Sequence, residues 1–146
     1  MLRTAYLRRR GIPLSRTQQF DRFADEWNLE ELRQALRREL RTHRGQLALA
    51  RLIGVGRAVV RKFVEMRSIP RIEHLERIRE WAADRPSAEI PGGAVALALL
   101  VEELAPASRY RARGALAREL IRWFEEEGTE APEWLHQEIT DRQRIP

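Results

Sequence analysis

The stretch Gly45–Phe63, which reads GQLALARLIGVGRAVVRKF, contains two short helical patterns on either side of a glycine-centred break. In each pattern the apolar residues recur at spacings of three and four, which places their side chains on one face of an α-helix. We therefore expect one helix over Gln46–Ile53 and a second over Arg57–Glu65. The residues expected to be buried are Leu47, Leu49, Ala50 and Ile53 in the first helix and Val60, Phe63 and Val64 in the second.

The break between these helices is the tripeptide Gly54-Val55-Gly56, which leaves room for only a tight turn. Gly54 allows a positive φ at the end of the first helix, and Gly56 can serve as the N-cap of the second. Ala50 is small at the point where the two helices must cross closely. This arrangement is typical of a helix-turn-helix, whose second helix enters the major groove of DNA.

Over roughly Asn28–Asp84 the sequence resembles the λ repressor and Cro-like (Xre-type) helix-turn-helix proteins. The matching residues are Gln46 at the start of the motif, Ala50 at the helix crossing, Gly54 and Val55 in the turn, Val60 and Phe63 in the second helix, and Pro70, Ile72, Leu75 and Ile78 beyond it. The chain departs from the family at Gly56, where a Ser or Thr cap is usual. It departs again at Met66, where a Gly commonly ends the recognition helix. The resemblance implies an all-α, λ-repressor-like helix-turn-helix bundle, here with additional C-terminal helices.

The second motif helix carries the residues expected to read DNA bases. With its apolar residues facing inward, helical geometry turns the opposite side outward. The residues on that side are Arg57, Ala58, Arg61 and Lys62. An arginine or lysine can donate to guanine O6 and N7, and an alanine methyl group suits thymine. The resemblance implies base reading by the same four positions.

The resemblance also implies a phosphate contact at Gln46, the first residue of the first motif helix. The backbone N–H groups and the dipole of a helix N-terminus favour an anion at that place. Further phosphate contacts are expected from arginines that flank the motif, namely Arg44, Arg67 and Arg71.

The distribution of charge favours a nucleic-acid partner for the first half of the chain. Residues 1–85 hold 20 lysines and arginines against 11 acidic residues, whereas residues 86–146 hold 7 against 11. The net charges of the two parts are therefore +9 and −4, and the two halves are expected to have different partners. Three cations between Arg57 and Lys62, with no acid before Glu65, favour DNA binding over a helix-turn-helix without that function.

Four regions are predicted: a basic arm over residues 1–14, a DNA-binding domain over 15–85, a linker over 86–93 and a helical region over 94–146. The arm could follow phosphates or enter a minor groove, or it could be a solvated tail. Within the domain, Asn28 and Glu31 form a capping-box signature, which predicts a helix up to Trp27 and a new one from Asn28. The arginines expected on the outer face of that new helix are Arg33, Arg37, Arg38 and Arg41. We interpret them as a solvated face in preference to a second DNA surface.

The helix expected over Ala94–Leu104 is apolar on nearly every side, so it must be buried in a core or against another chain. A second apolar stripe follows at Leu116, Leu120, Ile121 and Phe124. Together these surfaces exceed what one short neighbouring helix can cover. We therefore expect the C-terminal region to form a homodimer, with a fully intramolecular three-helix packing as the alternative.

The sequence argues against several other classes of protein. The chain has no cysteine, and His43, His74 and His136 are not at metal-binding spacing, so neither a metal site nor a cofactor is expected. No phosphate loop, nucleophile elbow or metal-hydrolase motif is present, so an enzyme is not expected. No apolar run approaches the roughly 18 residues of a membrane span, and the lack of cysteine favours a cytoplasmic setting.

These observations predict a sequence-specific transcriptional regulator that binds double-stranded DNA as a homodimer at a near-palindromic operator. One alternative is an antitoxin-like interaction module, whose acidic C-terminal helices bind a partner protein while DNA binding serves autoregulation. Another is a non-specific nucleoid or recombination accessory protein, which would show a low specificity ratio.

Overall fold

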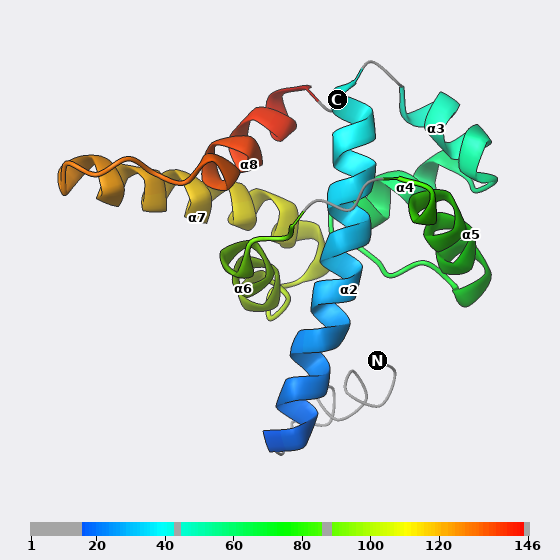
Figure 1. Cartoon of the computed structure of the whole chain (residues 1–146), viewed down its shortest axis with the longest axis horizontal. Coiled ribbons are helices and arrows are strands. Elements are labelled where there is room, and N and C mark those ends of the chain that lie inside the picture. Colours follow the sequence, from blue (N-terminus) through cyan, green and yellow to red (C-terminus); the bar gives the residue numbers. More distant parts are fainter. Residues whose placement is uncertain (1–15, 43–44, 86–88, 145–146) are drawn as a thin grey trace.

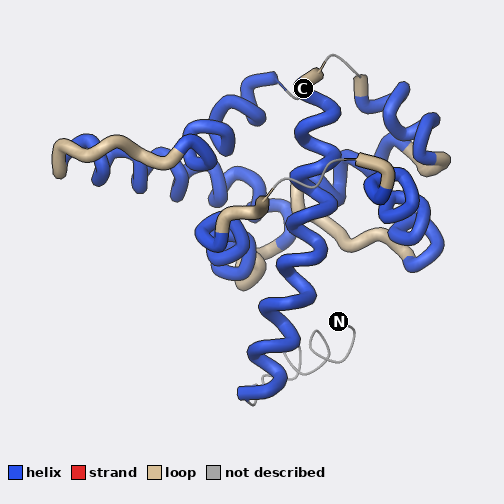
Figure 2. The backbone as a smooth tube through the Cα atoms, in the orientation of Figure 1, coloured by secondary structure: helices blue, strands red, loops and turns tan. Residues whose placement is uncertain are grey.

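In the computed structural model, the described residues (16–42, 45–85 and 89–144) form seven α-helices and no strand. The helices are α2 (Arg16–Arg41), α3 (Gln46–Ile53), α4 (Arg57–Val64), α5 (Ile72–Ala83), α6 (Gly92–Val101), α7 (Pro106–Glu126) and α8 (Glu133–Arg144). Figure 2 shows the helices in blue and the described loops and turns between them in tan. The expectation of an all-α fold is confirmed, while the predicted basic arm lies outside the described residues.

Helix α2 is the element around which the other helices are arranged (Figure 1). With 26 residues it is about 39 Å long, with α3, α4 and α5 on one side and α6, α7 and α8 on the other. The predicted start of a new helix at Asn28 is wrong. No glycine or proline interrupts residues 16–41, and Asn28 and Glu31 both lie within one continuous helix.

One apolar core brings together residues of α2, α3, α4 and α5. Its buried members are Leu29, Leu32, Leu36, Leu49, Ala50, Ile53, Val60, Phe63, Val64, Leu75, Ile78 and Trp81. All three apolar residues predicted for the second motif helix are therefore in the core, as are three of the four predicted for the first.

Leu47, which is predicted to be buried, and Ile72, one of the residues that carry the family resemblance, are exposed instead. Leu47 is 47% exposed because the inward stripe of α3 begins one residue earlier, at Gln46, and continues through Leu49, Ala50 and Ile53. Ile72 is 67% exposed. It occupies the first position of α5, and Leu75, one turn later, is the first residue of that helix to enter the core.

The C-terminal helices cover most of their own apolar surface. On α6 the buried residues are Ala94, Val95, Leu97, Ala98 and Val101. Leu97 packs with Ala117, Ile121, Ala131 and Leu135 of the segments that follow. The helix begins within the predicted linker, and a Cβ atom on Gly93 would collide with the ring of Trp134, which lies against this glycine. The large apolar side chains left exposed on this side are Leu100, Leu104, Leu120 and Trp123.

A buried cluster of ion pairs joins α2 to α7 and α8. Its arginines are Arg33, Arg37, Arg41 and Arg113, and its acids are Glu26, Glu30, Glu138 and Asp141. Four positive charges therefore face four negative ones, and all members except the half-buried Arg41 are buried. We refer to these eight residues as the buried ion-pair cluster.

The prediction of a solvated face on α2 is wrong for Arg33 and Arg37, which are 4% and 3% exposed. Arg37 donates from Nε to Asp141 Oδ2 at 2.9 Å and from Nη1 to Glu138 Oε1 at 3.3 Å. Arg33 Nη1 lies 2.7 Å from Glu26 Oε1. Isolated buried charges are costly, so these arginines are inside only because carboxylates from α2 and α8 neutralise them.

Arg113 of α7 lies in the middle of the cluster and binds two carboxylates. It donates to Glu30 Oε2 at 2.9 Å from Nη1 and to Glu138 Oε2 at 3.1 Å from Nε. Burial raises the pKa of Glu30, but the guanidinium groups of Arg113, Arg33 and Arg37 outweigh burial and leave the pKa below its ordinary value. The pKa of Glu26 is raised, because its burial outweighs its pairing with Arg33.

Within the described part of the chain, no helix combines the length and the apolar character needed to cross a bilayer.

Candidate nucleic-acid interface

Helices α3 and α4 are joined by the three-residue turn that the sequence predicts. Gly54 ends α3 with φ 88° and ψ 33°, the left-handed conformation that glycine adopts without a Cβ clash. The N–H groups of Gly54 and Val55 both donate to the carbonyl of Ala50, at 2.8 and 3.0 Å. Gly56 is the N-cap of α4, with φ −72° and ψ 150°. The turn therefore closes the end of α3 and starts α4 within three residues.

The outer face of α4 carries the four residues predicted to contact bases. Arg57, Ala58, Arg61 and Lys62 are all exposed, whereas Val60, Phe63 and Val64 face the core. No acidic residue lies in α4, so its solvent-facing side has three cations and one methyl group. Arg57 Nε donates to the neutral amide oxygen Gln46 Oε1 at 3.5 Å, and no carboxylate within the described residues forms an ion pair with Arg57.

The residues predicted to contact phosphates have different surroundings. The side chain of Gln46 is mostly buried beside Arg57, so a phosphate would meet the N-terminus of α3 rather than an outstretched amide. Arg67 is exposed, with Nε 3.9 Å from Glu65 Oε2, and Arg71 is exposed immediately before α5. Arg44 lies outside the described residues.

Sequence reasoning missed residues that hold the motif from outside. Arg77 of α5 donates from Nη1 to the carbonyl of Gly54, which fixes α5 against the turn. Arg33 of α2 donates from Nε to the carbonyl of Phe63 at 3.3 Å and lies over the Phe63 ring, 5.1 Å from its centroid. Both contacts join residues that are far apart in the sequence. In the sequence alone, these two arginines look like ordinary surface residues. Only a position that breaks the amphipathic pattern of its helix could have indicated their role.

Met66, where the resembled family commonly has glycine, takes the backbone conformation that a glycine would take. Its φ is 61°, the one positive φ of a non-glycine residue in the described part of the chain. Such a conformation is strained for a residue with a Cβ and persists only when the surroundings enforce it. The surroundings here are the C-terminal helices, since Met66 is 3% exposed and packs on Ala98 and Val101.

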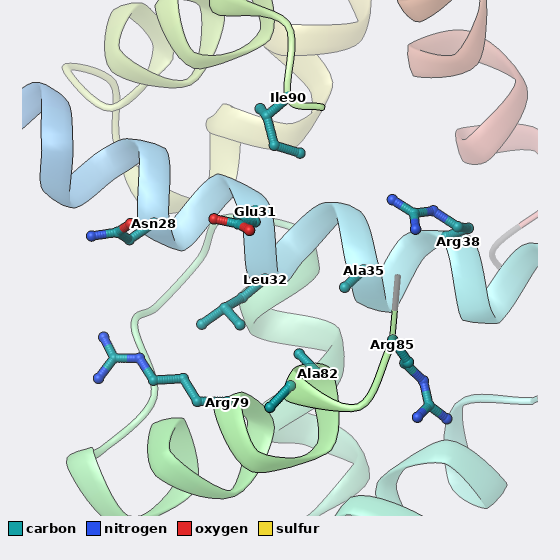
Figure 3. A pocket seen from close by; sticks show the side chains of 10 residues that line it. Asn28, Glu31, Leu32, Ala35, Arg38, Arg79, Ala82, Arg85 and Ile90 are labelled. Atoms are coloured by element: carbon teal, nitrogen blue, oxygen red, sulfur yellow. The ribbon is translucent and has the colours of Figure 1, made fainter. Parts of the chain in front are cut away.

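A hollow of about 310 Å³ lies between α2 and α5, beside Ile90 (Figure 3). Its apolar lining includes Leu32, Ala35 and Ala82, and its polar rim includes Arg79 and Arg85. None of its lining residues belongs to α3 or α4, so the hollow is separate from the exposed face of α4.

Comparison of the chain with protein-family models, with curated proteins and with solved structures found no match.

Proposed function

We propose that this chain is a sequence-specific regulator of transcription that binds double-stranded DNA with α4 in the major groove. One observation carries the proposal. The exposed side of α4 presents three cations and no acid, on a helix whose opposite side is locked in the core. A rigid helix with outward Arg57, Arg61 and Lys62 suits guanine edges, and Ala58 leaves room for a thymine methyl group.

A comparison of two triple variants of the full chain tests this proposal. In the first, Arg57, Arg61 and Lys62 are replaced by Ala, and in the second, the exposed Arg111, Arg118 and Arg122 of α7 are replaced. Both variants lose three positive charges. Selection from random duplexes identifies the preferred sequence, and fluorescence anisotropy measures affinity for it. Only the α4 variant should lose the preference for that sequence. The affinity of the wild-type protein should fall steeply with salt.

Two results would contradict the proposal. One is a wild-type protein that binds no duplex at low salt. The other is an equal loss of affinity in the two variants, which would reduce the role of α4 to a general effect of net charge.

The proposed regulator acts as a homodimer on a near-palindromic operator. Support comes from the exposed apolar side chains of the C-terminal half, Leu100, Leu104, Leu120 and Trp123. A two-fold dimer places its recognition helices about 34 Å apart or a multiple of that distance. Sedimentation equilibrium decides the stoichiometry. A monomer at tens of micromolar would contradict the dimer, and co-purification of an unrelated protein would favour the antitoxin-like alternative.

A further inference from the structure

We propose that Arg109 of α7 is a specificity-determining positioning residue. It fixes the C-terminal end of the recognition helix, so that base selectivity depends on helices that do not touch DNA. This inference rests on the proposed function of α4. It concerns how the contact face of α4 is held, and it assigns Arg109 no contact with DNA.

Arg109 uses its whole guanidinium group to bind three backbone carbonyls. Nη1 donates to Met66 at 3.1 Å, Nη2 to Glu102 at 3.2 Å and Nε to Leu104 at 3.1 Å. The first carbonyl follows the recognition helix, and the other two belong to the turn between α6 and α7. Arg109 therefore connects the end of α4 to that turn.

Met66 provides the apolar part of the same junction. Its side chain packs on Ala98 and Val101 of α6, with Ala112 and Leu116 of α7 against the same cluster. Arg113 Nη1 approaches its sulfur at 3.5 Å. The left-handed backbone of Met66 turns the side chain into this site, and the packing compensates for an unfavourable φ.

The end of α4 is also held by α2. The carbonyl of Phe63 lies in the last turn of α4, accepts from the Met66 N–H at 3.0 Å, and has Arg33 as a second donor. Cations at this end also interact favourably with the helix dipole. Arg33 and Arg109 therefore fix the C-terminal end of α4 from two elements, and Arg77 fixes the turn near its N-terminal end.

The position of α4 matters because base reading depends on geometry. The helix has eight residues and is about 12 Å long, so a small tilt at its C-terminal end moves Arg61 and Lys62 in the groove. Hydrogen bonds weaken steeply when donors are displaced or misaligned. Contacts with phosphates tolerate such movement better, because they depend mainly on charge.

The test compares Arg109→Ala with Arg111→Ala in the full chain. Arg111 lies on the same helix, is exposed, and loses the same charge on substitution. For Arg109→Ala we expect the ratio of specific to non-specific affinity to fall about tenfold, as for one lost base contact, with the salt slope unchanged. Arg111→Ala should keep the wild-type ratio. An equal ratio in Arg109→Ala, Arg111→Ala and wild type would overturn the proposal.

Hydrogen exchange supplies a readout that does not need DNA. The amides of Met66 and Arg67 donate to the carbonyls of Phe63 and Lys62, at 3.0 and 2.8 Å. They should exchange faster in Arg109→Ala than in Arg111→Ala. Wild-type protein that binds no duplex would refute the proposed function, whereas unchanged exchange in Arg109→Ala would refute the positioning role by itself.

A second variant keeps the proposal testable if Arg109→Ala does not fold. Met66→Gly keeps a residue that accepts positive φ and removes only the side chain that packs on α6 and α7. It should lower the specificity ratio in the same direction and leave the salt slope unchanged. A wild-type ratio for Met66→Gly would contradict the proposal even if Arg109→Ala cannot be purified.

Discussion

Helices α2 and α4 both carry several arginines at helical spacing, yet the two sets have opposite surroundings. Arg57 and Arg61 of α4 point into solvent, and no carboxylate lies on their helix. Arg33 and Arg37 of α2 are buried and paired with carboxylates. The same residue type therefore stabilises the fold on one helix and is left available for a ligand on the other.

The difference comes from what packs against each helix. The outer face of α4 is exposed apart from the contact of Arg57 with Gln46 of α3, whereas α2 packs against α6 and α8. Helix α8 supplies Glu138 and Asp141, about a hundred residues further along the chain than Arg37. Without these acids the cluster would hold four positive charges and two negative ones, so α8 is required for electrical balance inside the fold.

The largest expected effect is on stability, from Arg113→Ala. Removal of this side chain leaves Glu30 and Glu138 buried with less compensation, and breaking one partner of a buried pair costs about 3–5 kcal/mol. Urea denaturation followed by circular dichroism measures the free energy of unfolding. A loss below about 1 kcal/mol, which is typical of exposed pairs, would contradict the structural role of the cluster.

The buried ion-pair cluster should make the stability of the fold depend on pH through Glu30, whereas the exposed arginines of α4 should not. Because its folded pKa lies below its unfolded value, about 4.3 for a glutamate, ionised Glu30 stabilises the fold above that value. This stability is lost as the pH falls through the folded pKa. Glu30→Gln should be less stable than wild type at neutral pH, and the difference should shrink on acidification.

The control for this pH dependence is Arg61→Ala, whose side chain has no partner in the buried ion-pair cluster. Its stability should follow the wild-type pH profile. Denaturation midpoints are measured from pH 7 downward. If the difference in midpoint between Glu30→Gln and wild type did not change with pH, ionised Glu30 would not be the source of the stability.

A smaller effect, on affinity instead of stability, is expected for Arg61→Ala. An exposed arginine that reads a base should contribute about 1–3 kcal/mol to binding of the selected sequence. The free energy of unfolding should change by no more than about 0.5 kcal/mol, because the side chain makes no buried contact. Anisotropy and denaturation of the same sample test both parts. A loss of stability with unchanged affinity would mean that Arg61 stabilises the fold, as Arg33 and Arg37 of α2 do, and does not read a base.

The two short helices α3 and α4 and the turn between them were predictable because their signals are local. The positive φ at Gly54, the N-cap at Gly56 and the inward Val60, Phe63 and Val64 all follow from short sequence spacings. The stripe of α3 was misplaced by one residue because a polar side chain, Gln46, occupies the inward position where Leu47 was expected.

The surroundings of Arg33, Arg37 and Met66 were not predictable, because their partners are distant in the sequence. An arginine on a helix has the same local signature whether it meets water or Asp141. Likewise, a methionine after a helix does not predict a positive φ. Here that conformation depends on a packing site formed by α6 and α7. The capping-box signature at Asn28 was locally sound, and tertiary packing along α2 overrode it.

The smallest effect is expected for Arg122→Ala, which isolates burial as the variable. Arg122 lies on the same helix as Arg113 and likewise approaches two carboxylates, those of Glu119 and Glu126. Its side chain is 58% exposed, so water and salt screen the attraction, and holding long side chains in one geometry costs entropy. Urea denaturation should therefore give the wild-type midpoint at both low and high salt. If Arg122→Ala destabilised the fold as much as Arg113→Ala, burial would not be what distinguishes the two arginines.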